Sequence, residues 1–588
     1  MKKSNLYIAI LTAGMLFSCN KKLDLPSDGR ITMDQVFSDY NRTRGYLNSC
    51  YGFAPALSVD RAGFTDDAQD ADDITPGSRF QAWYAGNITT TNYPSVSIDG
   101  SPWARLYEGI RRCNVFIESI KTATVFATEA EKGGWTAQAH TLRALYYLQL
   151  IKRYGGVPIF DKPLEINHDF SKDRKATFSE VARFIIQDCN TALSYPNTRE
   201  GFPWAIYENQ FGIMSRAVAY AIKSQTVTFA VSPLFSDGTF TVAEATTITA
   251  DALAQCLAND YRLFNLVPAA TVAQNSYALY HFTTSNDQRA TDKETIYQLG
   301  GQMRMWEFAG MPSNPGVTKA GPNPTQELVD AYEMANGQVP ITGYSDADQL
   351  VPIVNTASGY DPENPYVSRD PRFYASIYYN GAVRFLNQPT GKKVATNIGG
   401  AEGISTTNRI NTRTGYYTRK FNNSASGRTN NADGSIRLFR LAELYLNFAE
   451  CAYQSVGPDA QVTSGSFNMS AREAVNAVRA RVNMPAFPAG MSKEAFEARY
   501  RNERRIELVF EDHRFFDVRR WKILDQTDKS VTGMRIEGTV AAPTYTRFKL
   551  GDRNAHSEKY LLYPIDQEEV NKVMNLTGQN WQNPGWLD

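Results

Sequence analysis

Helical periodicity is the feature that most restricts how this chain of 588 residues can fold. Apolar residues recur three and four positions apart in four long segments, which is the spacing of one face of an α-helix. In the last of these segments Ala217 and Ala221 share a face, and small side chains let a neighbouring helix approach closely. The pattern predicts paired antiparallel helices over residues 103–120, 135–154, 178–193 and 215–231.

Helices resume near the C-terminus, over residues 438–454, 471–482 and 499–524. The last of these is densely charged, and we expect Arg501, Arg504 and Arg505 to pair with acidic residues of the preceding helices. The helix spacing is similar to that of tetratricopeptide repeats, although no regular repeat of roughly 34 residues is visible. The sequence therefore predicts a mostly α fold built on tetratricopeptide-like helix pairs.

Two regions break this helical pattern. Residues 60–100 are polar and rich in turn residues, as is typical of loops that carry function. Residues 232–435 are rich in Gly, Pro, Asn and Thr and contain short apolar runs. In the second region Asn380-Gly381 separates residues 377–379 from 383–385, and this sequence predicts a β-hairpin. We therefore expect an irregular, loop-rich region with short β-hairpins.

The N-terminus has the pattern of a bacterial lipoprotein signal. Lys2 and Lys3 precede an apolar run over residues 6–16, and small Ser18 precedes Cys19. The run is about half of the roughly 20 residues needed to span a bilayer. The sequence predicts a signal peptide over residues 1–18 and a lipid anchor on Cys19. The alternative is a secretory signal that has a cysteine nearby by chance.

Charge and composition exclude several classes of function. Without Lys2 and Lys3 the mature chain has 59 basic and 61 acidic residues, a net charge of −2, whereas binding to a nucleic-acid backbone requires a basic excess. The chain has five histidines, and no two have the spacing of zinc ligands on a helix. We expect no nucleic acid, no metal and no other cofactor. The remaining cysteines are expected to be buried apolar residues: Cys50, Cys113, Cys189, Cys256 and Cys451.

Several sequence blocks closely resemble the SusD/RagB family of outer-membrane lipoproteins. The C-terminal blocks are residues 437–450, 476–481 and 503–521, joined by 324–333, 369–373, 563–565 and 582–586. The N-terminal half agrees through Leu23-Asp24-Leu25-Pro26, Trp103 with Tyr107 and Asn114, 143–147 with 154–158, and 232–235. The resemblance covers nearly the whole mature chain.

This resemblance implies a SusD-like fold with an N-terminal helical region over 19–235 and a RagB/SusD C-terminal region over 236–588, together one compact unit. It also implies a protein that is not an enzyme. Such proteins bind an oligosaccharide, or in the RagB branch a peptide, and act as a lid on a SusC-like TonB-dependent outer-membrane transporter. The resemblance also implies display on the cell surface. The residues after Cys19 do not themselves indicate it, since Lys21 and Lys22 stand where acidic residues would favour surface display.

Candidate ligand-binding residues lie in two loop segments. A sugar binder needs exposed aromatic rings flanked by polar groups, and family members place such rings in roughly these two regions. For Trp83 and Trp306 the alternative is ordinary packing. The predicted ligand contacts are Asp66, Asp67, Arg79, Phe80, Trp83, Tyr84 and Tyr93 in the first segment, and Arg304 and Trp306 in the second.

The acidic residues of the first segment have three possible roles. Asp66, Asp67, Asp70, Asp72 and Asp73 could be solvated, could accept hydrogen bonds from sugar hydroxyls, or could bind Ca²⁺, although the glycine and terminal glutamate of an EF-hand loop are missing. Two competing functions remain open. One is a lipid-anchored glycoside hydrolase that uses a carboxylate pair from residues 66–73. The other is a helical-repeat adaptor that binds only proteins.

Overall fold

The computed structural model describes most of the chain after residue 30: residues 31–54, 59–100, 102–204, 211–266, 275–282, 291–299, 305–313, 316–384, 392–422, 434 and 436–586. The predicted signal peptide, Cys19 and Arg304 lie outside the described residues. The fold is 46% helical, with a few short strands in small sheets, which confirms the predicted mostly α class.

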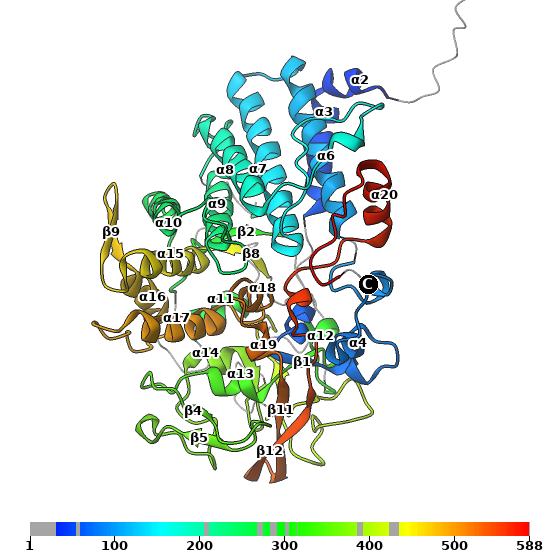
Figure 1. The fold of residues 1–588 in the computed structure, drawn as a ribbon. Helices are drawn as coiled ribbons and strands as arrows, with labels where there is room; N and C mark the ends of the chain where they lie inside the picture. The colour runs from blue at the N-terminus through cyan, green and yellow to red at the C-terminus, as the bar shows by residue number, and fades with distance from the viewer. Residues whose placement is uncertain are drawn as a thin grey trace, which may run out of the picture.

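The predicted helices form one continuous array in which each helix packs against the next (Figure 1). The four N-terminal segments are confirmed as helices, with boundaries close to those expected, and each buries one face against its neighbours. The array comprises α3 (Tyr40–Cys50), α6 (Pro102–Ser119), α7 (Glu129–Tyr154), α8 (Phe178–Ser194), α9 (Arg216–Ala230), α10 (Val242–Ala258), α15 (Leu441–Val456), α16 (Ala471–Ala480) and α17 (Lys493–Glu507).

The array is continuous in space but interrupted in sequence. Helix α10 ends at Ala258 and α15 begins at Leu441, yet the two helices pack against each other. Helix α9 joins the same contact, because the Gln225 side chain donates to the Glu443 carboxylate at 2.5 Å. Residues 259–436 are therefore an insertion in the helical scaffold. The expected boundary between residues 235 and 236 falls inside the scaffold, between α9 and α10.

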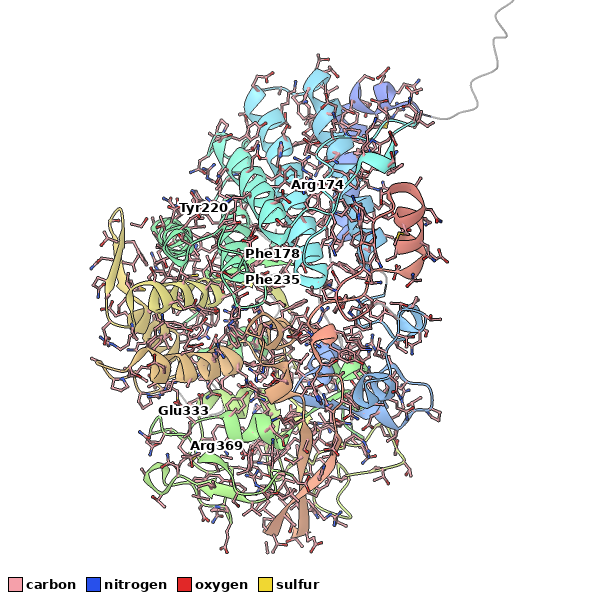
Figure 2. All side chains as sticks on the ribbon, viewed as in Figure 1. Arg174, Phe178, Tyr220, Phe235, Glu333 and Arg369 are labelled. Carbon is pink, nitrogen blue, oxygen red and sulfur yellow. The ribbon has the colours of Figure 1, made fainter. Side chains whose placement is uncertain are left out.

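Local sequence explains where the helices begin. Thr177 and Glu180 form a capping box at the start of α8, and Ser470 and Glu473 form another at α16. Each box satisfies backbone N–H groups that the first helical turn leaves without partners. Phe178, the first residue of α8, stacks on Phe235 beyond α9 with ring centroids 4.2 Å apart (Figure 2).

The inserted region and the C-terminal part contribute short helices and two-stranded sheets. The remaining helices are α2 (Met33–Phe37), α4 (Arg79–Ala85), α5 (Tyr93–Val96), α11 (Ser276–Phe282), α12 (Met305–Phe308), α13 (Gln326–Ala331), α14 (Pro371–Ser376), α18 (His513–Arg520), α19 (Leu524–Thr527) and α20 (Gln567–Thr577). The antiparallel pairs are β1 (Ala68–Asp70) with β3 (Pro322–Pro324), β2 (Thr295–Gln298) with β8 (Arg437–Arg440), β4 (Ile341–Tyr344) with β5 (Pro352–Val354), β6 (Ile377–Tyr378) with β7 (Tyr417–Thr418), β9 (Gln461–Ser464) with β10 (Phe467–Ser470), and β11 (Ser530–Thr539) with β12 (Ala542–Asp552).

The predicted hairpin around Asn380-Gly381 is wrong. Strand β6 pairs with β7, so Tyr378 lies opposite Tyr417 and not opposite Val383. Gly381 does make a turn, with φ of 87°, but the chain after it pairs with the segment around Lys393 and Val394. A turn signal fixes a local change of direction, whereas the partner strand is chosen by packing.

The single helix predicted over residues 499–524 is also wrong. The chain forms α17, a turn, and then α18, with Phe510 and Asp512 in the left-handed region at φ of 61° and 74°. The turn brings Glu507 and Glu511 to the same guanidinium, because Arg440 contacts both carboxylates at 2.7 Å.

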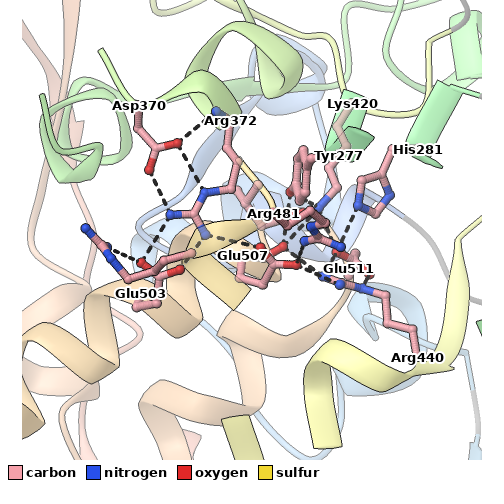
Figure 3. Close-up of polar contacts among 12 residues, drawn as sticks. Tyr277, His281, Asp370, Arg372, Lys420, Arg440, Arg481, Glu503, Glu507 and Glu511 are labelled. Atoms are coloured by element: carbon pink, nitrogen blue, oxygen red, sulfur yellow. Dashed lines mark hydrogen bonds and ion pairs between the residues drawn. The ribbon is translucent and has the colours of Figure 1, made fainter. Parts of the chain in front are cut away.

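A buried network of charges joins the scaffold to the insertion (Figure 3). Arg440, at the start of α15, contacts Glu294 at 2.8 Å, and Arg481 after α16 contacts the same carboxylate at 2.8 Å. Arg372 of α14 contacts Asp370 at 2.8 Å and Glu507 of α17 at 3.1 Å. Buried charges are tolerated when each is paired and hydrogen-bonded. This network fixes the register between the insertion and α15–α17.

One large hydrophobic core runs from Phe37 in α2 to Trp586 near the C-terminus. It contains residues from both the predicted N-terminal and the predicted C-terminal regions. Within the described ranges, no helix is both long and apolar enough to cross a membrane.

Candidate ligand-binding cleft

The predicted aromatic platforms of the first segment lie in the core. Trp83 is only 3% exposed, and its indole N–H donates to the carbonyl of Val96 at 2.9 Å. Phe80 stacks on Phe64 at 4.5 Å, and Tyr93 is fully buried. The expectation that these three rings form exposed platforms is wrong, because α4 and α5 turn them inward to close the loop over the core.

Tyr84, another predicted ligand residue, also makes contacts within the protein. Its hydroxyl donates to the carbonyl of Gly63 at 2.7 Å and accepts from the N–H of Asp70 at 3.0 Å. The Arg553 guanidinium lies over its ring, 4.0 Å from the centroid. Tyr84 thus connects the loop to the C-terminal part of the chain.

Asp66 and Asp67 form buried ion pairs. Asp66 contacts Arg514 at 2.7 Å and Arg505 at 3.1 Å, and Asp67 contacts Arg505 at 2.7 Å. Burial raises the pKa of Asp66, but the two arginines outweigh this effect and lower it to about 2. Arg505 therefore pairs with the N-terminal loop and not with a preceding helix as expected. The same expectation is wrong for Arg504, which contacts Asp517 of α18 at 2.8 Å, and for Arg501, which contacts Glu497 of its own helix.

The other three aspartates of the segment also have cationic neighbours. Asp72 contacts Arg409 at 3.1 Å, and Asp73 contacts Arg413 at 2.8 Å. Burial raises the pKa of Asp70 to about 7, although nearby Lys319 opposes the shift. Among the residues that the structure describes, no group of three or more His, Cys, Asp or Glu side chains could hold a metal ion.

Arg79 is the predicted ligand residue that reaches a cavity. The cavity, which we call the arginine cleft, has a volume of about 300 Å³ and lies beside the scaffold where the loop meets α6. Its apolar wall includes Phe53, Ile98 and Leu106. Its charged residues are Asp60, Arg61, Arg79, Asp99, Arg105 and Arg153.

Asp99 pairs with two arginines on the buried side of the arginine cleft. Arg61 and Arg153 each contact its carboxylate at 2.6 Å, and the hydroxyl of Tyr563 donates to it at 3.2 Å. Burial raises the pKa of Asp99, but the two arginines lower it to about 2. Arg61 also contacts Asp512 at 2.6 Å. Sequence reasoning did not predict Arg61, Asp99, Arg105 or Arg153, because these residues are far apart along the chain and form no motif.

The chain that follows the second predicted ligand segment, residues 280–306, reaches the arginine cleft through Lys319. Lys319 contacts Asp60 of the arginine cleft at 3.3 Å, and its carbonyl accepts from the N–H of Gly310, just after α12. Trp306 lies on α12, and on the same helix Phe308 is 36% exposed. Gly310, just after the end of α12, thus pairs with Lys319, whose side chain reaches Asp60 of the arginine cleft.

A larger and more apolar cavity lies between α6, residues 158–173 and α20. This helical groove has a volume of about 610 Å³. Asn114 supports its floor by donating to the carbonyl of Phe160 at 2.9 Å and accepting from Arg143 at 2.7 Å. Its apolar lining includes Trp103, Tyr107, Phe160, Phe170, Val570 and Trp581. Several residues that carry the SusD/RagB resemblance in the N-terminal half thus build this groove.

The fold defines a class of protein in which a tetratricopeptide-like helical scaffold carries a loop-rich insertion, and in this chain a cleft lies beside the scaffold. The SusD family model matches residues 277–586, more than half of the chain, and a second SusD-like model, described as starch-binding and associating with the outer membrane, matches residues 47–207. The chain belongs to the SusD family.

Solved structures of this family share the fold over nearly the whole chain. A SusD-like protein from Bacteroides fragilis NCTC 9343 is 25% identical, with a TM-score of 0.74 over 94% of this chain and 98% of its own. A SusD-like carbohydrate-binding protein from the same strain has 21% identity and a TM-score of 0.67 over 92% and 99%. Surface glycan-binding protein A from Bacteroides fluxus has 18% identity and a TM-score of 0.55 over 93% and 100%.

A curated relative matches part of the chain. SusD-like protein P38 from Formosa agariphila is 23% identical over 187 residues, which is 32% of this chain. The match spans about a third of the relative's own length, 36%.

Proposed function

We propose that this chain is a lipoprotein of the outer membrane, anchored through Cys19 and facing the cell surface. It binds an oligosaccharide without cleaving it and delivers the ligand to a SusC-like TonB-dependent transporter, over which it acts as a lid. The observation that carries the proposal is membership of the SusD family over both halves of the chain.

The arginine cleft and α12 support a sugar ligand at this face. A glycan needs a ring for its apolar C–H surface and donors for its hydroxyls. Phe53 and the exposed Phe308 supply the aromatic rings, and Arg79 supplies hydrogen-bond donors. The absence of catalysis is consistent with Asp66 and Asp67, which are buried against Arg505 and Arg514 and so cannot flank a glycosidic bond.

A peptide ligand is the second candidate, and the helical groove favours it. The groove is lined mainly by apolar and aromatic side chains, which suit the side chains of a peptide better than the hydroxyl-rich edge of a sugar. Its rim includes Phe170, which is 48% exposed.

Arrays of glycans and peptides, probed with the lipidated protein in detergent, test the two ligands. We expect saturable glycan binding with the glycan recovered intact. The Phe308→Ala substitution should weaken binding several-fold because it removes a stacking ring, whereas the matched Phe170→Ala substitution should leave it unchanged. Binding of peptides alone, with loss in Phe170→Ala, would favour the peptide candidate. Release of shortened glycans would contradict a lid without catalysis.

A further inference from the structure

Positive charge exceeds negative charge in the arginine cleft. Its lining contains four arginines and two aspartates, a net charge of +2. The chain as a whole has equal numbers of basic and acidic residues, so this excess is local.

Asp99 balances only part of this charge. Its single carboxylate lies between Arg61 and Arg153, and Asp512 supplies the second carboxylate that Arg61 and Arg153 need. This buried half of the cleft is therefore neutral overall and structural. With Asp512 counted, four arginines face three aspartates, and the remaining excess of one positive charge lies at Arg79 and Arg105, for which Asp60 is the one carboxylate in the lining.

Arg79 shares its carboxylate partner with another cation. It contacts Asp60 at 3.2 Å, and Lys319 contacts the same carboxylate at 3.3 Å. The other guanidinium contact of Arg79 is to the carbonyl of Ile98 at 2.9 Å. Its side chain is 30% exposed, so a ligand can reach it.

Arg105 has no carboxylate partner among the described residues. One guanidinium nitrogen donates to the carbonyls of Ala54 at 3.1 Å and Gly52 at 3.4 Å. These contacts orient the side chain beside Phe53 but leave its charge unbalanced. An oriented, exposed guanidinium retains donors for a planar or tetrahedral oxyanion.

We propose that the arginine cleft selects glycans that carry an anionic group, a carboxylate or a sulfate on the sugar, and that Arg79 and Arg105 bind this group. The inference rests on the proposed function, because it names the ligand class of the same cleft. The sugar ring that bears the anion lies against Phe53. The cleft has a volume of about 300 Å³ and therefore holds only a short part of a glycan. The remaining sugar units of the glycan extend towards α12.

Matched pairs of oligosaccharides test the inference. Calorimetry with the lipidated protein in detergent compares oligouronates with their methyl esters, and sulfated oligosaccharides with their desulfated forms, beside a panel of neutral glycans. We expect a charged member of at least one pair to bind roughly tenfold more tightly than its neutral counterpart. Preference for the uronates or for the sulfates then identifies the anion.

Arginine variants assign the effect to the cleft. Arg79→Gln and Arg105→Gln should each remove most of the preference, whereas Arg79→Lys should retain part of it. Arg44→Gln changes an exposed arginine of α3 and should have no effect. Equal binding within every pair, binding of neutral glycans alone, or an unchanged preference in both variants would overturn the inference and leave the proposed function standing. Failure of every charged and neutral glycan to bind would overturn both.

Discussion

At the residue scale, ion pairs with Arg505 and Arg514 explain why the predicted ligand residues Asp66 and Asp67 are buried. The sequence indicated that Asp66–Tyr93 is a loop with aromatic and acidic residues, but it could not indicate that Arg505 and Arg514 pair with Asp66. Periodicity describes one element at a time, whereas these contacts join residues from opposite halves of the chain. Arg79 alone among the predicted residues of this segment reaches the arginine cleft.

Asp99 should stabilise the fold in a pH-dependent way. Its pKa of about 2 lies below the ordinary aspartate value of about 3.9, so its stabilisation is present above pH ~4 and is lost as pH falls through about 2. We expect Asp99→Asn to lower the free energy of unfolding at pH 7 by about 3 kcal/mol, because it leaves Arg61 and Arg153 short of a partner.

Denaturant unfolding of both proteins between pH 7 and pH 2 measures this effect. The gap between wild type and Asp99→Asn should shrink as pH falls from 4 towards 2. A gap that is constant across this range would mean that the carboxylate charge contributes no stability.

At the element scale, long helices were predictable and strand partners were not. The N-terminal segments became α6 to α9 because an apolar face repeated over many turns leaves few alternatives. The hairpin at Asn380-Gly381 failed because two-residue strands carry little register information. The helix over 499–524 failed because Phe510, which adopts a left-handed conformation, is not of a type that signals a break, and the helix-capping residue Asp512 stands in a densely charged run.

Gly156 should be required for the chain after α7 to turn under the helical groove. A Cβ at this position would lie against the carbonyl oxygen of Ala176, closer than real Cβ atoms approach. We expect Gly156→Ala to lower the thermal unfolding temperature by several degrees, since the backbone must shift to relieve the clash.

Gly45→Ala is the matched control. Gly45 lies inside α3, and an added Cβ would meet no atom within 4 Å. Replacing a helical glycine by alanine should stabilise the protein by about 0.5–1 kcal/mol. Equal melting temperatures for Gly156→Ala and wild type would show that the turn tolerates a side chain.

At the scale of the whole molecule, the insertion has hydrophobic clusters of its own, and the buried charge network joins it to the scaffold. The family resemblance predicted the fold and its tetratricopeptide-like scaffold, and both are confirmed. The packing of α10 on α15 across the insertion could not be predicted from helix periodicity, because the pattern does not indicate which helices are neighbours.

Arg440 should be essential to this packing. It contacts Glu294, Glu507 and Glu511, so Arg440→Leu removes the one cation that these three buried carboxylates share and leaves each with fewer cationic partners. We expect a loss of about 4 kcal/mol in the free energy of unfolding, measured with denaturant. The exposed control Arg44→Leu should change it by less than about 0.5 kcal/mol. A similar small change for Arg440→Leu would mean that the network is not structural.

The most direct test of the central claim is recovery of the native complex. The lipidated protein, affinity-purified in mild detergent from outer membranes of the source bacterium, should bring with it a large TonB-dependent barrel in a stable complex. Cys19→Ser should abolish both the membrane association and the recovery of the barrel. Recovery of wild-type protein from the outer membrane as a monodisperse lipoprotein with no such barrel would contradict its role as a transporter lid.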